Sequence, residues 1–145
     1  MNRAATLVLL LIAAGALILR WPALDQRPFH TDESVHAIKF LGLWERGVYR
    51  YDPREYHGPS LYYATLPVAW LARAAGESQP GERTLRLVPV AFGVALILLL
   101  PLLRDALGRR GVMAAAIFTT LSPAFVFYSR YYIHELLLVL ATLAG

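Results

Sequence analysis

The apolar residues of this chain fall in long blocks separated by short polar stretches, not in the alternating pattern of a half-exposed sheet. A helix needs about 20 apolar residues to cross a hydrocarbon core of about 30 Å. The first apolar block, which ends at Leu19, is short for a membrane span. Because Arg20 can snorkel to the interface and Trp21 suits the interface, the block becomes long enough to cross the membrane. The pattern predicts an all-α, polytopic membrane protein with spans at about 4–24, 87–103, 112–128 and 136–145.

The two ends of the chain need separate comment. A cleaved signal peptide is the alternative for the first block, because Arg3 precedes it and Ala14-Gly15-Ala16 resembles a cleavage site. The apolar run continues to Leu19, which favours an uncleaved anchor. The last block is too short to cross a bilayer at 1.5 Å per residue. We therefore expect residues 1–145 to be the N-terminal transmembrane module of a longer protein.

Residues 25–57 form the first polar loop, which is predicted to lie on the outer side. Thr31 can cap a helix whose first turn holds Asp32 and Glu33. Gly47 then provides a stop. Within these limits the apolar residues recur at helical spacing, which predicts a short amphipathic helix in the plane of the interface. Its apolar face holds Ala37, Phe40, Leu41 and Trp44, and another face holds Glu33, His36, Lys39 and Arg46.

The next apolar stretch, 58–76, decides the topology. If it spans the membrane, the loop with Arg104, Arg109 and Arg110 lies on the same side as Asp32, and the polar segment 129–135 lies opposite. If it is interfacial or re-entrant, the arginine loop becomes cytoplasmic, as the positive-inside rule prefers. Segment 129–135 then returns to the side of Asp32. We favour this second arrangement, because one assumption satisfies two constraints.

The composition narrows the choice of function. The net charge of +4 would suggest nucleic acid in a soluble domain, but here the arginines flank apolar blocks and more simply set topology, so we expect no nucleic-acid partner. Cysteine is absent, which excludes disulfides and thiolate metal sites.

Polar residues that can carry chemistry form three clusters. The first holds His30, Asp32, Glu33 and His36, in which Asp32 and His36 at i,i+4 can bind a divalent metal or orient one another; the alternative is a capping Asp beside a solvated Glu. The second is 55–59 with His57, where an interfacial histidine beside aromatic anchors is the alternative. The third is 128–135, where the alternative is a loop at the membrane interface. Such a loop explains Tyr128, Tyr131 and Tyr132 as interfacial anchors, but it does not explain Arg130, His134 and Glu135 together. Arg86 heads an apolar block and is either a phosphate ligand or an ordinary flank.

In this order the clusters resemble the GT-C superfamily of membrane glycosyltransferases, and within it the protein O-mannosyltransferase and lipid A aminoarabinose transferase group. Asp32-Glu33 matches the acidic pair of the first outer loop, and His57-Gly-Pro-Ser-Leu61 resembles the His-Pro-Pro-Leu-like turn. The family's Arg with Gly seven residues later is matched by Arg86 and Gly93. Ser129–Glu135 is similar to its Ser-Arg-Tyr segment, although His134-Glu135 stands where Asp is frequent. The extra histidines near Asp32 point to a branch linked to surface-polysaccharide or archaeal-type glycosylation.

The resemblance implies an inverting transferase in the cytoplasmic membrane with its active side facing outward. The donor would be a polyprenyl-phosphate-linked sugar, and the acceptor a hydroxyl on protein, lipid or glycan. It implies that Asp32 is the base and that Glu33, or His57 and Glu135, position the acceptor or a metal. Arg86 and Arg130 would neutralise the leaving phosphate, with His134 also at the substrate site. A divalent metal is possible through His30, Asp32, His57, His134 and Glu135, but the spacing does not demand one.

Two further functions stay open. One is a non-catalytic GT-C-like partner in the translocation or binding of lipid-linked glycans. The other is a metal-binding membrane sensor built from the four histidines of the chain.

Overall fold

The structure is a computed structural model that describes residues 2–54 and 57–145, and every regular element in these ranges is helical. The predicted all-α class is therefore confirmed. The elements are α1 (Arg3–Arg20), α2 (Thr31–Arg46), α3 (Ser60–Ala74), α4 (Glu82–Leu99), the 3₁₀ helix η1 (Leu100–Leu103), α5 (Arg104–Leu121), α6 (Pro123–Tyr128) and α7 (Glu135–Ala144).

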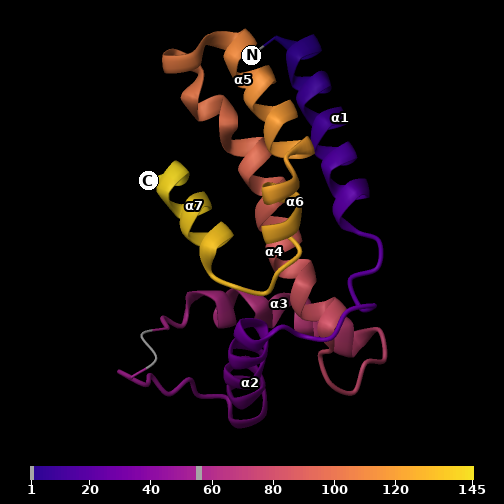
Figure 1. Ribbon diagram of the computed structural model, residues 1–145, viewed down its shortest axis with the longest axis vertical. Helices are drawn as coiled ribbons and strands as arrows, with labels where there is room; N and C mark the ends of the chain where they lie inside the picture. The colour runs from indigo at the N-terminus through magenta and orange to yellow at the C-terminus, as the bar shows by residue number, and fades with distance from the viewer. Residues whose placement is uncertain (1, 55–56) are drawn as a thin grey trace.

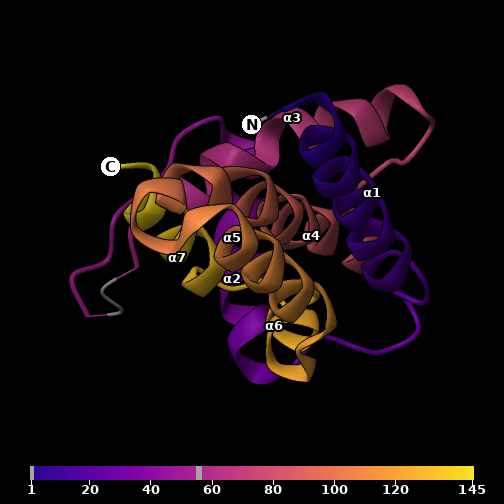
Figure 2. The same ribbon diagram turned by 90° about the horizontal axis from the view of Figure 1, so that it is seen from above.

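Helices α1, α4 and α5 run side by side along the long axis of the molecule (Figures 1 and 2). Small residues such as Ala13, Ala16 and Ala116 are buried where these helices meet, so the backbones approach closely. The outer surface of this bundle stays apolar: the exposed fraction is 63% for Leu11, 70% for Ile18 and 75% for Phe118. Within the described residues two helical segments, 3–20 and 82–121, are long and apolar enough to cross a membrane. This surface points to membrane association.

The second of these segments is a hairpin. The chain reverses through η1 and at Gly108, whose φ of 66° and ψ of 170° interrupt α5. The predicted span 112–128 is not one continuous helix, because α5 stops at Leu121 and α6 begins after a break at Ser122 (ψ 123°). Pro123 explains the break, since a proline disfavours the helical conformation of the residue before it and has no N–H to donate.

Arg20 corrects another expectation. Its side chain does not snorkel toward the interface but is fully buried between α1, α4 and α5. The guanidinium donates to the carbonyls of Thr119 and Thr120 at 2.9 and 3.2 Å and to Ser129 Oγ at 2.7 Å. The first helix accordingly ends at Arg20 instead of continuing to residue 24. Arg20 therefore ties the C-terminal end of α5 to α1.

Helix α3 lies across one end of the bundle instead of running along it (Figure 1). The loop with Arg104, Arg109 and Arg110 lies at the opposite end, beside the N-terminus, whereas α2 and segment 129–134 lie at the end that holds α3. The polar segment 129–134 and α2 thus lie at the same end of the bundle, as the second arrangement considered for 58–76 requires, and the non-spanning character of 58–76 stays a prediction. The acidic cluster of α2 and the polar segment before α7 consequently meet.

Helix α2 ends as expected at Gly47, which adopts a left-handed conformation with φ of 71°. Its N-cap is His30, not Thr31. The buried face also differs from the predicted one, because Glu33 and His36 are buried together with Ala37, Phe40 and Leu43. Two polar residues assigned to a solvated face therefore lie inside the molecule, where each needs a partner.

Candidate functional site

The centre of this end of the molecule is a buried ion pair between Glu33 of α2 and Arg86 of α4. Arg86 Nε and Nη2 donate to the two oxygens of Glu33, each at 2.8 Å. Nη1 donates to the carbonyls of Leu24 and Arg27, both at 2.7 Å, and Nη2 also donates to that of Pro28 at 3.2 Å. An arginine has five N–H donors, so every donor of Arg86 is used within the protein.

Both carboxylate oxygens of Glu33 are likewise used in hydrogen bonds within the protein. Its oxygens also accept hydrogen bonds from the backbone N–H groups of His30, at 3.1 Å, and Tyr132, at 3.0 Å. Burial raises the pKa of Glu33, but the hydrogen bonds from Arg86 and the two backbone groups outweigh it, so this pKa lies below its ordinary value. The carboxylate is therefore ionised and joins α2, α4 and segment 129–134.

This geometry corrects two expected roles. Glu33 is 0% exposed and Arg86 2%, and neither has a polar atom left for a substrate. These contacts favour a structural role for Glu33 and Arg86 over the catalytic and phosphate-binding roles expected from the sequence. Together they form a lock that fixes the first loop onto the bundle. We call the pair the Glu33–Arg86 lock.

Asp32 has the opposite environment, although it is the neighbour of Glu33. Its side chain is 71% exposed, and a carboxylate oxygen lies 3.9 Å from Nδ1 of His30. The expected pairing with His36 is not seen among the described contacts of Asp32, because His36 is buried against Tyr62. The lock therefore holds the turn of helix from which a free carboxylate projects.

A cationic cavity of about 370 Å³ lies beside the lock, lined mainly by Ala23, Leu24, Arg27, Arg86, Phe127 and Arg130. Arg27 lies over the rings of Tyr131 and Phe127 at 5.3 and 5.6 Å, and His30 packs on the same Tyr131 ring at 5.6 Å. Arg130 anchors to the carbonyl of Pro22 at 2.6 Å, and its buried Nε has no hydrogen-bond partner in the described part of the chain. Arg27 also lies 3.8 Å from a carboxylate oxygen of Glu33, so three arginines share this one carboxylate or lie near it at the cavity, and the cavity is cationic.

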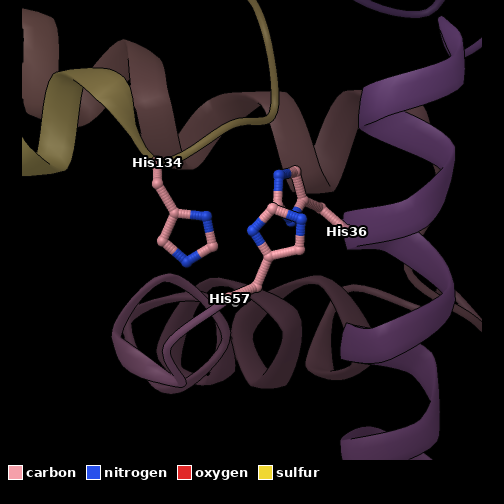
Figure 3. A group of neighbouring side chains, drawn as sticks. All are labelled: His36, His57 and His134. Atoms are coloured by element: carbon pink, nitrogen blue, oxygen red, sulfur yellow. The ribbon is translucent and has the colours of Figure 1, made fainter. Parts of the chain in front are cut away.

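Three histidines from three parts of the chain meet in a second polar group (Figure 3). His36 comes from α2, His57 from the turn before α3 and His134 from the residue before α7. Their ring centroids lie 4.5 to 5.8 Å apart. One nitrogen from each ring lies within 4.8 Å of the other two. We call this group the histidine cluster.

The tautomer of His134 follows from its hydrogen bond. Nε2 lies 3.1 Å from the carbonyl oxygen of Gly58, which only accepts, so Nε2 carries the proton and Nδ1 a free lone pair. This Nδ1 is buried and has no partner among the described residues. An unsatisfied buried polar atom costs about 1–3 kcal/mol. The atom is therefore either a source of strain or a ligand for something that binds there.

The electrostatics of the cluster favour neutral rings. Burial, followed by the nearby His134, His57 and Lys39, lowers the pKa of His36 to about 4. Burial also lowers the pKa of His134, and the hydrogen bond to Gly58 opposes this only in part. Neutral imidazole is the form that binds metal ions.

Two further residues of the third cluster, His134 and Glu135, line different cavities. Glu135 is exposed and lines a separate cavity with Ala124, Phe125 and Tyr128, whereas His134 faces the cavity that contains His57. The structure thus does not bring Glu135 to His57, as a shared metal or acceptor site would require. Glu55 and Tyr56 of the second motif lie outside the described residues.

No protein-family model, curated protein or solved structure matches this chain.

Two features of the site escaped the sequence reasoning. Arg27 was not singled out, although its position after Trp21 and before the acidic pair is a signal that a basic residue lies near the interface. The four histidines were considered together only as a metal-binding sensor, and the sequence did not single out His36, His57 and His134, which are 21 and 77 positions apart. Three of only four histidines in the chain take part, and that scarcity was the available signal.

Proposed function

We propose that this protein is a GT-C-type membrane glycosyltransferase, in which a hydroxyl acceptor attacks a polyprenyl-phosphate-linked sugar at the outer face of the membrane. The observation that carries the proposal is the exposed carboxylate of Asp32, 3.9 Å from His30, which packs on the same Tyr131 ring as Arg27 of the cationic cavity. A base and an anion-binding pocket are the two elements that such a transfer needs.

The roles follow from the contacts. Asp32 takes the proton of the acceptor hydroxyl while that oxygen bonds to the anomeric carbon. The bond from this carbon to the phosphate oxygen breaks, and the polyprenyl phosphate leaves with the bonding electrons. Direct attack from the opposite face inverts the anomeric centre. Arg27 and Arg130, in place of Arg86, stabilise the charge that develops on the phosphate.

The position of the cavity supports a lipid-borne donor. The cavity is lined by two arginines, the exposed Arg27 and Arg130, whose Nε has no partner among the described residues. It is also lined by the apolar side chains of Pro123, Val126 and Phe127. A phosphate with a long hydrocarbon tail has this same combination of charge and apolar surface. The loop with Arg104, Arg109 and Arg110 lies at the far end and would be cytoplasmic by the positive-inside rule.

The test compares Asp32→Asn with Asp25→Asn, an exposed carboxylate of the same loop. Membranes from cells that produce the protein are incubated with a radiolabelled polyprenyl-phosphate hexose, and label in protein, lipid and glycan fractions is counted. Loss of a general base should lower transfer by about 10²–10⁴-fold. Asp25→Asn should match the wild type at equal protein levels.

Two results would count against the proposal. Equal transfer by Asp32→Asn and wild type would remove Asp32 as the base. No transfer by the wild type, together with retention of the labelled lipid that depends on Arg27 and Arg130, would favour the non-catalytic role in binding or translocation of lipid-linked glycans.

A further inference from the structure

We propose that His36, His57 and His134 form a binding site for a divalent transition-metal ion, of which Zn²⁺ is the best match. The three histidines include neither Asp32 nor any residue that lines the cationic cavity, so the inference does not rest on the proposed transferase reaction. Neither Asp32, His30 nor Glu135 belongs to it, in contrast to the set of ligands that the sequence suggested.

The distances are close to those of a metal centre. Zn–N bonds of about 2.0–2.1 Å at tetrahedral angles place ligand nitrogens about 3.4 Å apart. The three nitrogens of the cluster lie within 4.8 Å of one another. Side-chain rotations that move each nitrogen by about one ångström therefore bring them to the separation of zinc ligands. Imidazole nitrogens suit Zn²⁺, Cu²⁺ and Ni²⁺, whereas Mg²⁺ and Ca²⁺ require oxygen ligands.

The outer contacts are also those of metal-binding histidines, whose second nitrogen is typically fixed by a carbonyl, a carboxylate or a water molecule. His134 uses Nε2 for the carbonyl of Gly58 and leaves the lone pair of Nδ1 in the cluster. His36 contacts the hydroxyl of Tyr62 through Nδ1 at 3.0 Å, which leaves Nε2 for the ion. The buried nitrogen of His134 thereby gains a partner.

Position 57 is fixed through its backbone. The hydroxyl of Tyr49 donates to the carbonyl of His57 at 2.5 Å, and Gly58 and Pro59 lead directly into α3. The ring of His57 is stacked on that of His134 with an angle of 7° between the planes. The loop is therefore held so that its histidine faces the other two.

Three protein ligands leave one tetrahedral position open, which is the arrangement of metal sites that bind a water molecule or a substrate oxygen. A cavity of about 360 Å³ adjoins the cluster, lined by His57, Gly58, Ser60, His134 and leucines of α7. The open position faces this cavity, and its ligand is an oxygen donor such as water or a phosphate oxygen.

The experiment measures metal content and affinity, not transfer. The protein is purified in detergent, stripped with a chelator, and titrated with Zn²⁺ against a chromophoric chelator. Loss of an outer hydrogen-bond partner costs 10–100-fold in affinity, so loss of a ligand in His57→Ala should cost more than about 100-fold. His30→Ala, which removes the exposed histidine outside the cluster, should bind Zn²⁺ like the wild type.

His57 is the preferred ligand to replace, because it lies in a turn and is only half-buried. The wild type keeps the test valid even if a variant misfolds: it should bind about one Zn²⁺ per chain, and Zn²⁺ should raise its Tm. No bound Zn²⁺ in the wild type, or equal affinity in wild type and His57→Ala, would overturn the proposal. So would a loss of binding in His30→Ala.

A Co²⁺-loaded sample tests the open position. Tetrahedral Co²⁺ absorbs visible light, and addition of inorganic phosphate should shift these bands if an oxygen ligand enters the fourth position. An unchanged spectrum would mean that the position is closed. Both readouts are independent of sugar transfer, so the metal site and the transferase proposal can fail separately.

Discussion

The Glu33–Arg86 lock and the histidine cluster are two polar groups that both draw a residue from α2, Glu33 in one and His36 in the other. In the lock every donor of Arg86 and both oxygens of Glu33 have partners. In the cluster the Nδ1 of His134 is buried without a described partner, and a cavity adjoins it. A saturated polar network holds structure, whereas an unsaturated one beside a cavity is suited to binding.

The largest effect on stability is expected when one residue of the Glu33–Arg86 lock is replaced. Arg86→Met leaves the buried carboxylate of Glu33 without its main partner, which should lower the free energy of unfolding by about 3–5 kcal/mol. Thermal or denaturant unfolding in detergent, followed by circular dichroism, measures the loss. Arg104→Met, at an exposed arginine of the opposite end, is the control and should change little. A change below about 1 kcal/mol in Arg86→Met would mean that the lock is not structural.

The packing of α4 against Ser129 and Arg20 gives a second, smaller effect. A Cβ added at Gly93 would lie 2.7 Å from Cβ of Ser129 and 3.4 Å from Nε of Arg20. Gly93→Ala should therefore destabilise the protein by about 1–3 kcal/mol through overpacking. Gly15→Ala has no atom within 4 Å of the new Cβ and should stabilise α1 slightly. If both substitutions shift Tm in the same direction, the close contact at Gly93 is not what limits stability.

The two regions should also differ in their response to pH. The pKa of His36 falls from 6.5 to about 4 on folding, so below pH 6.5 the unfolded chain binds a proton that the folded chain does not. Stability should thus fall as the pH drops from 6.5 toward 4. Glu33 has a lowered pKa, and its contribution is fully present above pH 4.5 and lost below it.

Unfolding measured across this range in the presence of a chelator tests the difference. His36→Gln should flatten the upper part of the pH profile and leave the loss below pH 4.5 in place. A profile that His36→Gln does not alter would mean that this ring does not stay neutral in the folded protein.

The smallest effect is expected at the edge of the histidine cluster. Tyr62→Phe removes the hydroxyl that lies 3.0 Å from Nδ1 of His36 and should cost about 0.5–1.5 kcal/mol without metal. Tyr63→Phe, at the exposed neighbour, should have no measurable effect. The Zn²⁺ affinity of Tyr62→Phe should fall by about 10–100-fold, because this hydroxyl fixes the orientation of the His36 ring. Equal Zn²⁺ affinity in both variants would argue against that role.

Much of the fold was accessible from the pattern of the chain. The apolar blocks predicted the helices of the bundle, Gly47 predicted the end of α2, and the balance of arginines favoured an arrangement with segment 129–134 at the same end as α2. The wrong expectations concern residues whose partners are distant in the sequence. Arg20 was expected at the interface but binds the end of α5, and Glu33 was expected at a catalytic site but binds Arg86.

The sequence by itself determined the all-helical class, the approximate positions of the main helices and the end of α2 at Gly47, because these follow from local apolar patterning and from the conformations that glycine allows. It did not determine which polar residues meet. Asp32 and Glu33 are adjacent in the chain, yet one is exposed and the other buried, since successive residues on a helix point in different directions. The pairing of Glu33 with Arg86 and the meeting of His36, His57 and His134 depend on how α2, α3, α4 and segment 129–134 pack. Only the tertiary structure therefore separated the lock from the histidine cluster.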